Sequence, residues 1–190
     1  MMIDVSDSRL YSACAVIILC PLIWNILARL CYSFIPRTAT MQTRRLVCYS
    51  LALWIFLFSS YRDYLIRQAI LNQPTLVVAE EHSNALKSVA VLMFITGQVF
   101  VLSSFYKLGV TGTFLGDYCG ILMDAPLTSF PFNVLANPMY VGSTLSFLAL
   151  GLFYSSPVGV VLAMEVYLVY RVALIFEESF TKFIYERKAK

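Results

Sequence analysis

Four apolar segments constrain the fold of this chain more strongly than any other feature of its sequence. They cover residues 10–30, 46–60, 85–106 and 143–176, and a helix that crosses a bilayer needs about 20 mostly apolar residues. Of the 190 residues, 59% are hydrophobic and 13% are charged, whereas about 25% of the residues of a soluble domain are charged. One small core cannot bury this much apolar surface. The sequence therefore predicts an all-α fold, a polytopic integral membrane helical bundle that residues 1–190 form as a single domain.

The last apolar segment is too long for one crossing and slightly short for two. As one helix, its roughly 34 residues would extend about 51 Å, against a hydrocarbon core about 30 Å thick. The segment is broken at Pro157, because proline removes a helical hydrogen bond. Two interpretations remain open from the residues themselves. Either 143–154 is partly buried at the interface and 157–176 crosses the membrane, or the two halves form a tight hairpin.

The charged residues between the segments give conflicting indications of membrane orientation. The C-terminal tail, from Glu177 on, carries Lys182, Arg187, Lys188 and Lys190 and is expected in the cytoplasm by the positive-inside rule. Residues 107–142 carry one basic residue, Lys107, which favours the lumen for that loop. The linkers 31–45 and 61–84 both carry arginines, although a single crossing between them would place them on opposite sides.

Charge and ligand chemistry exclude two classes of function. The net charge of +3 is small and spread along the chain, so there is no basic stripe of the kind that nucleic acid requires. No metal site is expected either, since the five cysteines show no C-x-x-C spacing and His82, in a predicted polar loop over 67–84, is the single histidine.

Residues 112–142 are unusually rich in glycine, proline and aromatic side chains for a linker. The stretch holds four of the eight glycines and three of the seven prolines. Glycine lets the backbone approach a ligand closely, and proline constrains turns. A solvated linker would contain Ser, Lys and Glu instead. The composition predicts a structured loop that packs against membrane helices and is shaped around a ligand.

Two further features allow both a structural and a functional interpretation. Glu177 and Glu178 end the last apolar segment, where carboxylates oppose the helix dipole. They either are solvated at the interface or bind a cationic or polyhydroxylated ligand. Gly97 lies in the middle of the third segment, where its composition favours a close helix–helix contact.

Several short motifs resemble those of the phospholipid N-methyltransferases in order and in approximate spacing. The resemblance runs from about residue 102 to 185, with weaker similarity earlier in the chain. The motifs are Pro21-Leu-x-Trp24-Asn25, Cys48-Tyr-Ser50, Leu102-Ser-Ser-Phe105, Gly112-Thr-Phe-Leu-Gly-Asp-Tyr118, Phe130-Pro-Phe-Asn133, Asn137-Pro-Met-Tyr140 and Glu177-Glu178.

The resemblance implies a cofactor and the residues that bind it. Members of this family use S-adenosyl-L-methionine, bound by a Gly-x-Gly element in the third segment and by paired glutamates. The glutamates correspond to Glu177 and Glu178. The Gly-x-Gly element corresponds to Ile95, Thr96 and Gly97, where its first glycine is missing. By analogy with related membrane methyltransferases, the resemblance also favours the hairpin, because it brings Asn137–Tyr140 and the glutamates to one face.

The implied substrate is phosphatidylethanolamine, or its mono- and dimethyl forms, in the bilayer. Methyl transfer requires alignment, exclusion of water and a deprotonated amine. The catalytic candidates are Asp117, which could attract the amine or accept its proton, and Tyr140. Tyr140 belongs to a set of loop aromatics that could stabilise a quaternary ammonium by cation–π attraction. The alternatives are a turn carboxylate for Asp117 and interface packing for the aromatics. The set comprises Phe114, Tyr118, Phe130, Phe132 and Tyr140.

Two other functions remain as alternatives. One is a related enzyme that methylates the carboxyl group of isoprenylated cysteine; it would favour an arginine near the substrate, and residues 112–142 contain neither Arg nor Lys. The other is a non-catalytic lipid-binding membrane protein. The resemblance implies an endoplasmic reticulum membrane, or a mitochondrial one, and leaves open which of the three methylations the protein performs.

Overall fold

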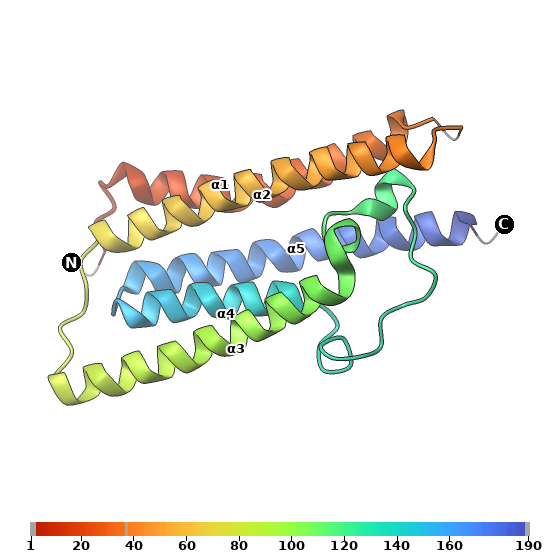
Figure 1. Ribbon diagram of the computed structural model, residues 1–190. Helices are drawn as coiled ribbons and strands as arrows, with labels where there is room; N and C mark the ends of the chain where they lie inside the picture. The colour runs from red at the N-terminus through yellow and green to blue at the C-terminus, as the bar shows by residue number, and fades with distance from the viewer. Residues whose placement is uncertain (1–2, 37, 189–190) are drawn as a thin grey trace.

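A computed structural model describes residues 3–36 and 38–188, which form an all-helical bundle (Figure 1). Helical structure is expected for a chain in lipid, because a helix satisfies its backbone hydrogen bonds internally. The elements are α1 (Ser8–Phe34), α2 (Met41–Asn72), α3 (Glu80–Thr113), the short 3₁₀ helix η1 (Gly116–Cys119), α4 (Pro138–Phe153) and α5 (Pro157–Lys188).

The helices run antiparallel in chain order along one long axis. In Figure 1, α1 and α2 lie side by side, α3 forms the opposite edge, and α4 and α5 lie between them. The ends of the first two helices are capped by side chains: Asp7 accepts from the backbone N–H of Arg9, and Thr40 accepts from that of Thr43. Each bond satisfies a donor that the first turn of a helix leaves unpaired.

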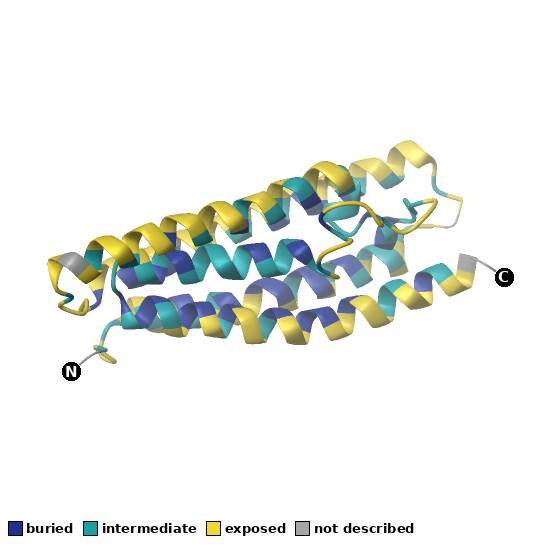
Figure 2. Ribbon diagram, turned by 90° about the horizontal axis from the view of Figure 1, so that it is seen from below, coloured by how far each residue is buried: buried dark blue, intermediate teal, exposed yellow. Residues whose placement is uncertain are grey.

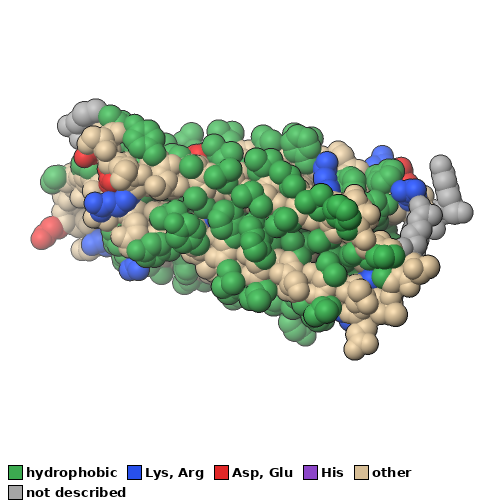
Figure 3. All heavy atoms as spheres, turned by 90° about the horizontal axis from the view of Figure 1, so that it is seen from above, with side chains coloured by type: hydrophobic (Ala, Val, Ile, Leu, Met, Phe, Trp, Pro, Cys, Tyr) green, Lys and Arg blue, Asp and Glu red, His purple; other side chains and the backbone are tan. Residues whose placement is uncertain are grey.

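Three of the helices are long and apolar enough to cross a membrane: α1, α3 and α5, with α4 as a shorter apolar helix. The exterior is correspondingly apolar. Figure 2 shows exposed residues along the outer faces of the helices, and Figure 3 shows hydrophobic side chains over the middle of the molecule, with most charged side chains toward its two ends. The prediction of a membrane helical bundle is confirmed.

The second predicted crossing is less clear than its neighbours. The segment 46–60 does form a helix, and α2, with 32 residues, is about 48 Å long. However, α2 is not among the three helices apolar enough to cross by composition. Arg45 precedes its apolar stretch, and Arg62 and Asp63 follow it.

The last apolar segment forms the predicted hairpin. α4 ends at Phe153, and α5 begins at Pro157 after a turn in which Ser155 adopts a positive φ of 48°. The two helices touch through glycine: a Cβ placed on Gly151 would lie 2.6 Å from the carbonyl carbon of Gly159. The two backbones can pack this closely only because both positions lack a side chain.

Two local predictions were wrong. Glu177 and Glu178 were expected to end the last helix, but α5 continues past them to Lys188, so the dipole penalty expected for a helix end does not apply. The polar stretch 67–84 was expected to be a loop, and its bounds were wrong: α2 extends to Asn72 and α3 begins at Glu80, so the loop covers only residues 73–79. His82 is therefore an exposed helical residue. In both cases the polar residues continue the helix beyond its apolar segment.

Candidate functional site

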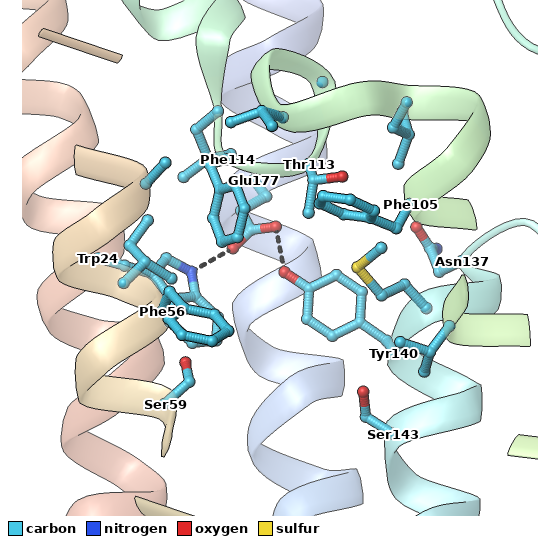
Figure 4. A pocket seen from close by; sticks show the side chains of 18 of the residues that line it. Trp24, Phe56, Ser59, Phe105, Thr113, Phe114, Asn137, Tyr140, Ser143 and Glu177 are labelled. Atoms are coloured by element: carbon cyan, nitrogen blue, oxygen red, sulfur yellow. Dashed lines mark hydrogen bonds between the residues drawn. The ribbon is translucent and has the colours of Figure 1, made fainter. Parts of the chain in front are cut away.

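A cavity of about 850 Å³ lies inside the bundle and reaches the loop end of the molecule (Figure 4). Its volume falls within the range of about 300–1,000 Å³ that is typical of small-molecule sites. Every long helix contributes to its lining, as does the loop between α3 and α4. The polar or aromatic lining residues include Trp24, Phe56, Ser59, Arg62, Phe105, Thr113, Phe114, Phe132, Asn137, Tyr140, Tyr170 and Glu177.

The chain closes this end of the cavity by bending at the end of α3. Gly109 has a φ of 62° inside the helix, a conformation that glycine adopts without steric cost. The chain after this bend carries Thr113, Phe114 and Leu115 to the cavity. The prediction that residues 112–142 form a structured loop packed on helices agrees with this arrangement.

Glu177 is the buried acidic group of the cavity. It is 8% exposed, and its carboxylate accepts three hydrogen bonds. Trp24 Nε1 and Asn25 Nδ2 donate to Oε1 at 2.7 and 2.9 Å, and the Tyr140 hydroxyl donates to Oε2 at 2.5 Å. A carboxylate in an apolar interior is tolerated when its oxygens are paired in this way. Residues from α1, α4 and α5 therefore meet at one carboxylate.

Glu178 lies beside this site but faces outward. Its side chain is exposed and accepts a hydrogen bond from Asn137 Nδ2 at 2.9 Å. Asn137 lines the cavity. The predicted meeting of the Asn137–Tyr140 turn with the glutamate pair is therefore confirmed in geometry: each glutamate is bonded to one end of that turn.

A second polar group lies elsewhere in the same cavity. Arg62 of α2 is 6% exposed, and its Nη1 donates to the Tyr170 hydroxyl at 2.8 Å. The rings of Tyr170 and Tyr140 meet edge to face with centroids 4.8 Å apart. Two touching tyrosines thus connect the buried arginine to the buried Glu177.

Asp117 lies in η1 and is not among the residues that line the cavity. Its carboxylate accepts from the Thr181 hydroxyl and from the backbone N–H of Tyr118, both at 3.1 Å. The bond from Thr181 attaches η1 to α5, whereas the bond from Tyr118 lies within η1. The predicted catalytic role of Asp117 stays a prediction, and its contacts favour a role in positioning the loop.

The structure does not bring Ile95, Thr96 and Gly97 to the cavity lining. Ile95 and Thr96 are exposed on α3. Gly97 is buried against α4, where an added Cβ would lie 2.6 Å from the carbonyl oxygen of Gly142. This is the close helix contact that composition favoured, and the cofactor role implied by the resemblance stays a prediction.

The loop aromatics divide into two groups. Phe114, Phe132 and Tyr140 line the cavity. Tyr118 instead stacks on Phe180 with centroids 5.0 Å apart, and Phe130 stacks on Phe100 at 6.1 Å. Only the first group is placed to face a cation in the cavity.

Several site residues were not predicted from the sequence. Trp24 and Asn25 appeared only within a motif, although an amide inside an apolar segment was a usable signal, since polar groups at membrane depth are functional candidates. Arg62 lies just after the second apolar segment, so its position in the sequence did not give this signal. Thr113 also appeared only within a motif. Its hydroxyl oxygen is buried without a hydrogen-bond partner in the described structure, and Figure 4 shows it beside the Phe105 ring in the cavity.

Comparison with known proteins places this geometry in context. A model of a family described as phospholipid methyltransferase matches residues 86–188. The chain is 44% identical over 187 residues to phosphatidylethanolamine N-methyltransferase of Rattus norvegicus, covering 98% of this chain and 93% of that protein. It is 44% identical over 190 residues to phosphatidyl-N-methylethanolamine N-methyltransferase of Saccharomyces cerevisiae, covering 99% and 90%. The protein of that name from Schizosaccharomyces pombe is 46% identical over 175 residues, covering 90% and 88%. No solved structure matches the chain.

Proposed function

Because the chain belongs to the phospholipid methyltransferase family, we propose that it methylates the headgroup amine of phosphatidylethanolamine or of its mono- and dimethyl derivatives, with S-adenosyl-L-methionine as methyl donor. The observation that supports this proposal most directly is a cavity inside an apolar bundle in which aromatic side chains surround a buried carboxylate that accepts three hydrogen bonds. Both reactants carry cationic groups, and the names of the relatives point to this substrate class.

The residues at the loop end of the cavity fit the methyl donor. Its sulfonium, ammonium and ribose hydroxyl groups suit carboxylates: Glu177 lies in the cavity at this end, and Glu178 lies beside the cavity next to Asn137. The unpartnered Thr113 hydroxyl adds a further donor or acceptor there. When bound, this group supplies a methyl carbon that is activated by the positive sulfur. Glu177, Glu178 and Thr113 are the residues that would hold it.

The chain itself supplies orientation and the exclusion of water. Trp24, Asn25 and Tyr140 fix the Glu177 carboxylate before any ligand arrives, so that little reorganisation is needed during reaction. Phe114 and the other cavity aromatics keep water from the amine lone pair. Their faces also stabilise the ammonium that forms as methyl groups accumulate.

The lipid would enter the cavity from the side of the bundle. Leu53 and Phe56 of α2 and Leu102 of α3 line the cavity and are also about 60% exposed on the apolar exterior, at 60%, 59% and 63%. Acyl chains can therefore remain in the bilayer between α2 and α3 while the headgroup reaches Glu177. The endoplasmic reticulum membrane, or a mitochondrial one, is the proposed location.

The test is direct methylation by the purified protein in lipid vesicles. Labelled methyl donor is supplied with each of the three amine lipids in turn, and the lipid products are resolved. We expect label in at least one methylated phospholipid. Label in an isoprenylated cysteine substrate, with none in the three lipids, would contradict the proposal, as would the absence of transfer to any acceptor.

A further inference from the structure

We propose that Arg62 is the anchor for the oxyanion of a bound reactant, namely the phosphodiester of the lipid substrate, which the cavity holds with its amine toward Glu177. This inference rests on the proposed function. It adds a binding residue on α2, outside the loop and the glutamate pair.

Arg62 is held in place by contacts that leave part of its guanidinium available. Nε and Nη2 donate to Asp63 Oδ1 at 3.0 and 2.8 Å, and Nη1 donates to the Tyr170 hydroxyl. Its carbon Cζ lies 5.3 Å from the centre of the Phe147 ring. A guanidinium has five N–H donors, so two have no acceptor among the described residues.

The charge balance around Arg62 also leaves room for an anion. Asp63 is the carboxylate that pairs with Arg62. Its side chain is 53% exposed, whereas the Arg62 side chain is 7% exposed. A pair with one solvated partner is weakened by water and salt. Arg62 lines the cavity together with Tyr170, Ser59 and many apolar side chains, and Glu177 is the one carboxylate among the described residues of that lining. A buried cation inside a membrane helical bundle is a functional candidate, and guanidinium matches phosphate oxygens in geometry.

The cavity therefore carries a positive charge at Arg62 and a negative charge at Glu177. The two are linked through the touching rings of Tyr140 and Tyr170. Phosphoethanolamine is dipolar in the same sense, since two carbons and one oxygen separate its nitrogen from its phosphorus. The methyl donor also has an oxyanion, the carboxylate of its amino-acid part, so the experiment must separate the two sources.

The test compares Arg62→Gln and Arg62→Lys in steady-state kinetics, with each reactant varied in turn. If the lipid phosphate is the ligand, Arg62→Gln raises KM for the amine phospholipid by about tenfold or more. KM for the methyl donor stays near the wild-type value. A rise confined to the KM for the methyl donor would overturn the assignment to the lipid phosphate and show that Arg62 binds the carboxylate of the methyl donor instead. Arg62→Lys keeps the positive charge but lacks the planar set of N–H donors of a guanidinium, so its KM for the lipid should lie between those of the wild type and Arg62→Gln.

A binding measurement makes the result independent of turnover. Labelled phosphatidylcholine carries the phosphodiester but cannot be methylated, and the Arg62→Gln protein should retain less of it. Arg29→Gln is the matched control. Arg29 also lies in an apolar helix and contacts an aromatic ring, with Cζ 4.8 Å from the Phe180 centroid, but it does not line the cavity.

The outcomes separate this inference from the proposed function. Suppose that the wild type methylates the lipid and that Arg62→Gln leaves both KM values and the retention of phosphatidylcholine unchanged. This result overturns the proposed role of Arg62 and leaves the proposed function standing. Equal losses in Arg29→Gln also overturn it. If Arg62→Gln does not fold, Arg62→Lys carries the test, and unchanged KM values in that variant count against the anchor.

Discussion

Glu177 and Glu178 are neighbours in the chain, but their side chains lie in different environments. Glu177 is buried and accepts three hydrogen bonds, whereas Glu178 is exposed and accepts one from Asn137. A charge in a water-excluded site interacts far more strongly than one in solvent. The two carboxylates are therefore expected to differ in their effect on the reaction.

Single substitutions should reveal this difference. We expect Glu177→Gln to lower kcat/KM for methyl transfer by about a hundredfold or more, as for the loss of one preorganised electrostatic group. Glu178→Gln should cost about tenfold or less, because its charge is screened by solvent. Both variants are assayed in the same vesicles at matched protein levels. Equal losses in the two would contradict the distinction between a buried and an exposed partner.

Trp24 offers a separate test of the buried network at the level of stability. Trp24→Phe keeps an aromatic ring but removes the N–H that donates to Glu177. The loss of this donor to a buried carboxylate should lower the free energy of unfolding by about 1–3 kcal/mol. The control is Trp54→Phe, since the Trp54 indole stacks near Phe58 at 5.0 Å and makes no hydrogen bond in the described part of the chain. Thermal unfolding in detergent compares the two. A similar shift in both would remove the special role of Trp24.

At the scale of elements, two pairs of glycines set how closely helices approach. Gly97 of α3 packs on Gly142 of α4, and Gly151 of α4 packs on Gly159 of α5. Each contact lies in an apolar interior, where close packing rather than the exclusion of water holds helices together. The pairs therefore hold α4 between its two neighbours.

Gly97→Ala distinguishes a packing role from a cofactor role. Its added methyl group would meet the Gly142 carbonyl oxygen at 2.6 Å, so we expect a lower unfolding temperature without any ligand, corresponding to about 1–3 kcal/mol of overpacking. Ser88→Ala, at an exposed position of α3, is the control and should be neutral. Unchanged stability combined with weaker binding of the methyl donor would instead support the cofactor role implied by the resemblance.

At the scale of the whole molecule, the hairpin decides which segments share a side of the membrane. The chain reverses at 154–156, so the α3–α4 loop and the C-terminal end of α5 lie at the same end of the bundle, opposite the beginning of α1 (Figure 1). The two predictions from the charged residues, a luminal loop over 107–142 and a cytoplasmic C-terminal tail, therefore cannot both be correct. The beginning of α2, which carries Arg44 and Arg45, lies at the same end of the bundle as the C-terminal end of α5, and this favours the cytoplasm for that end.

Accessibility mapping in sealed membranes tests this arrangement. Protease or glycosylation tags inserted at residue 126 and at the C-terminus should report the same side, the cytoplasm. A tag at the N-terminus should report the opposite side. A tag between residues 74 and 79 is the internal control and should agree with the N-terminus. Loop and tail tags on opposite sides would show that the hairpin does not form in the membrane.

The sequence by itself determined the class of the molecule. Apolar segments with few charges require helices in lipid, because backbone polar groups have no other partners there, and the motif order was sufficient to identify the family. The helical class and the motifs follow from composition and local order, which a linear chain displays directly. That the Asn137–Tyr140 turn would meet the glutamates was implied only by the resemblance to related membrane methyltransferases, since the residues themselves left two arrangements of 143–176 open.

Only the tertiary structure decided which side chains share the cavity. Trp24, Arg62 and Glu177 come from three helices far apart in the sequence, and their meeting depends on helix rotation and on the close approach of α4 and α5 at Gly151 and Gly159. The same packing separated Gly97 and Asp117 from the cavity lining. Helix rotation is set by the sum of many side-chain contacts, and no local pattern in the chain encodes that sum.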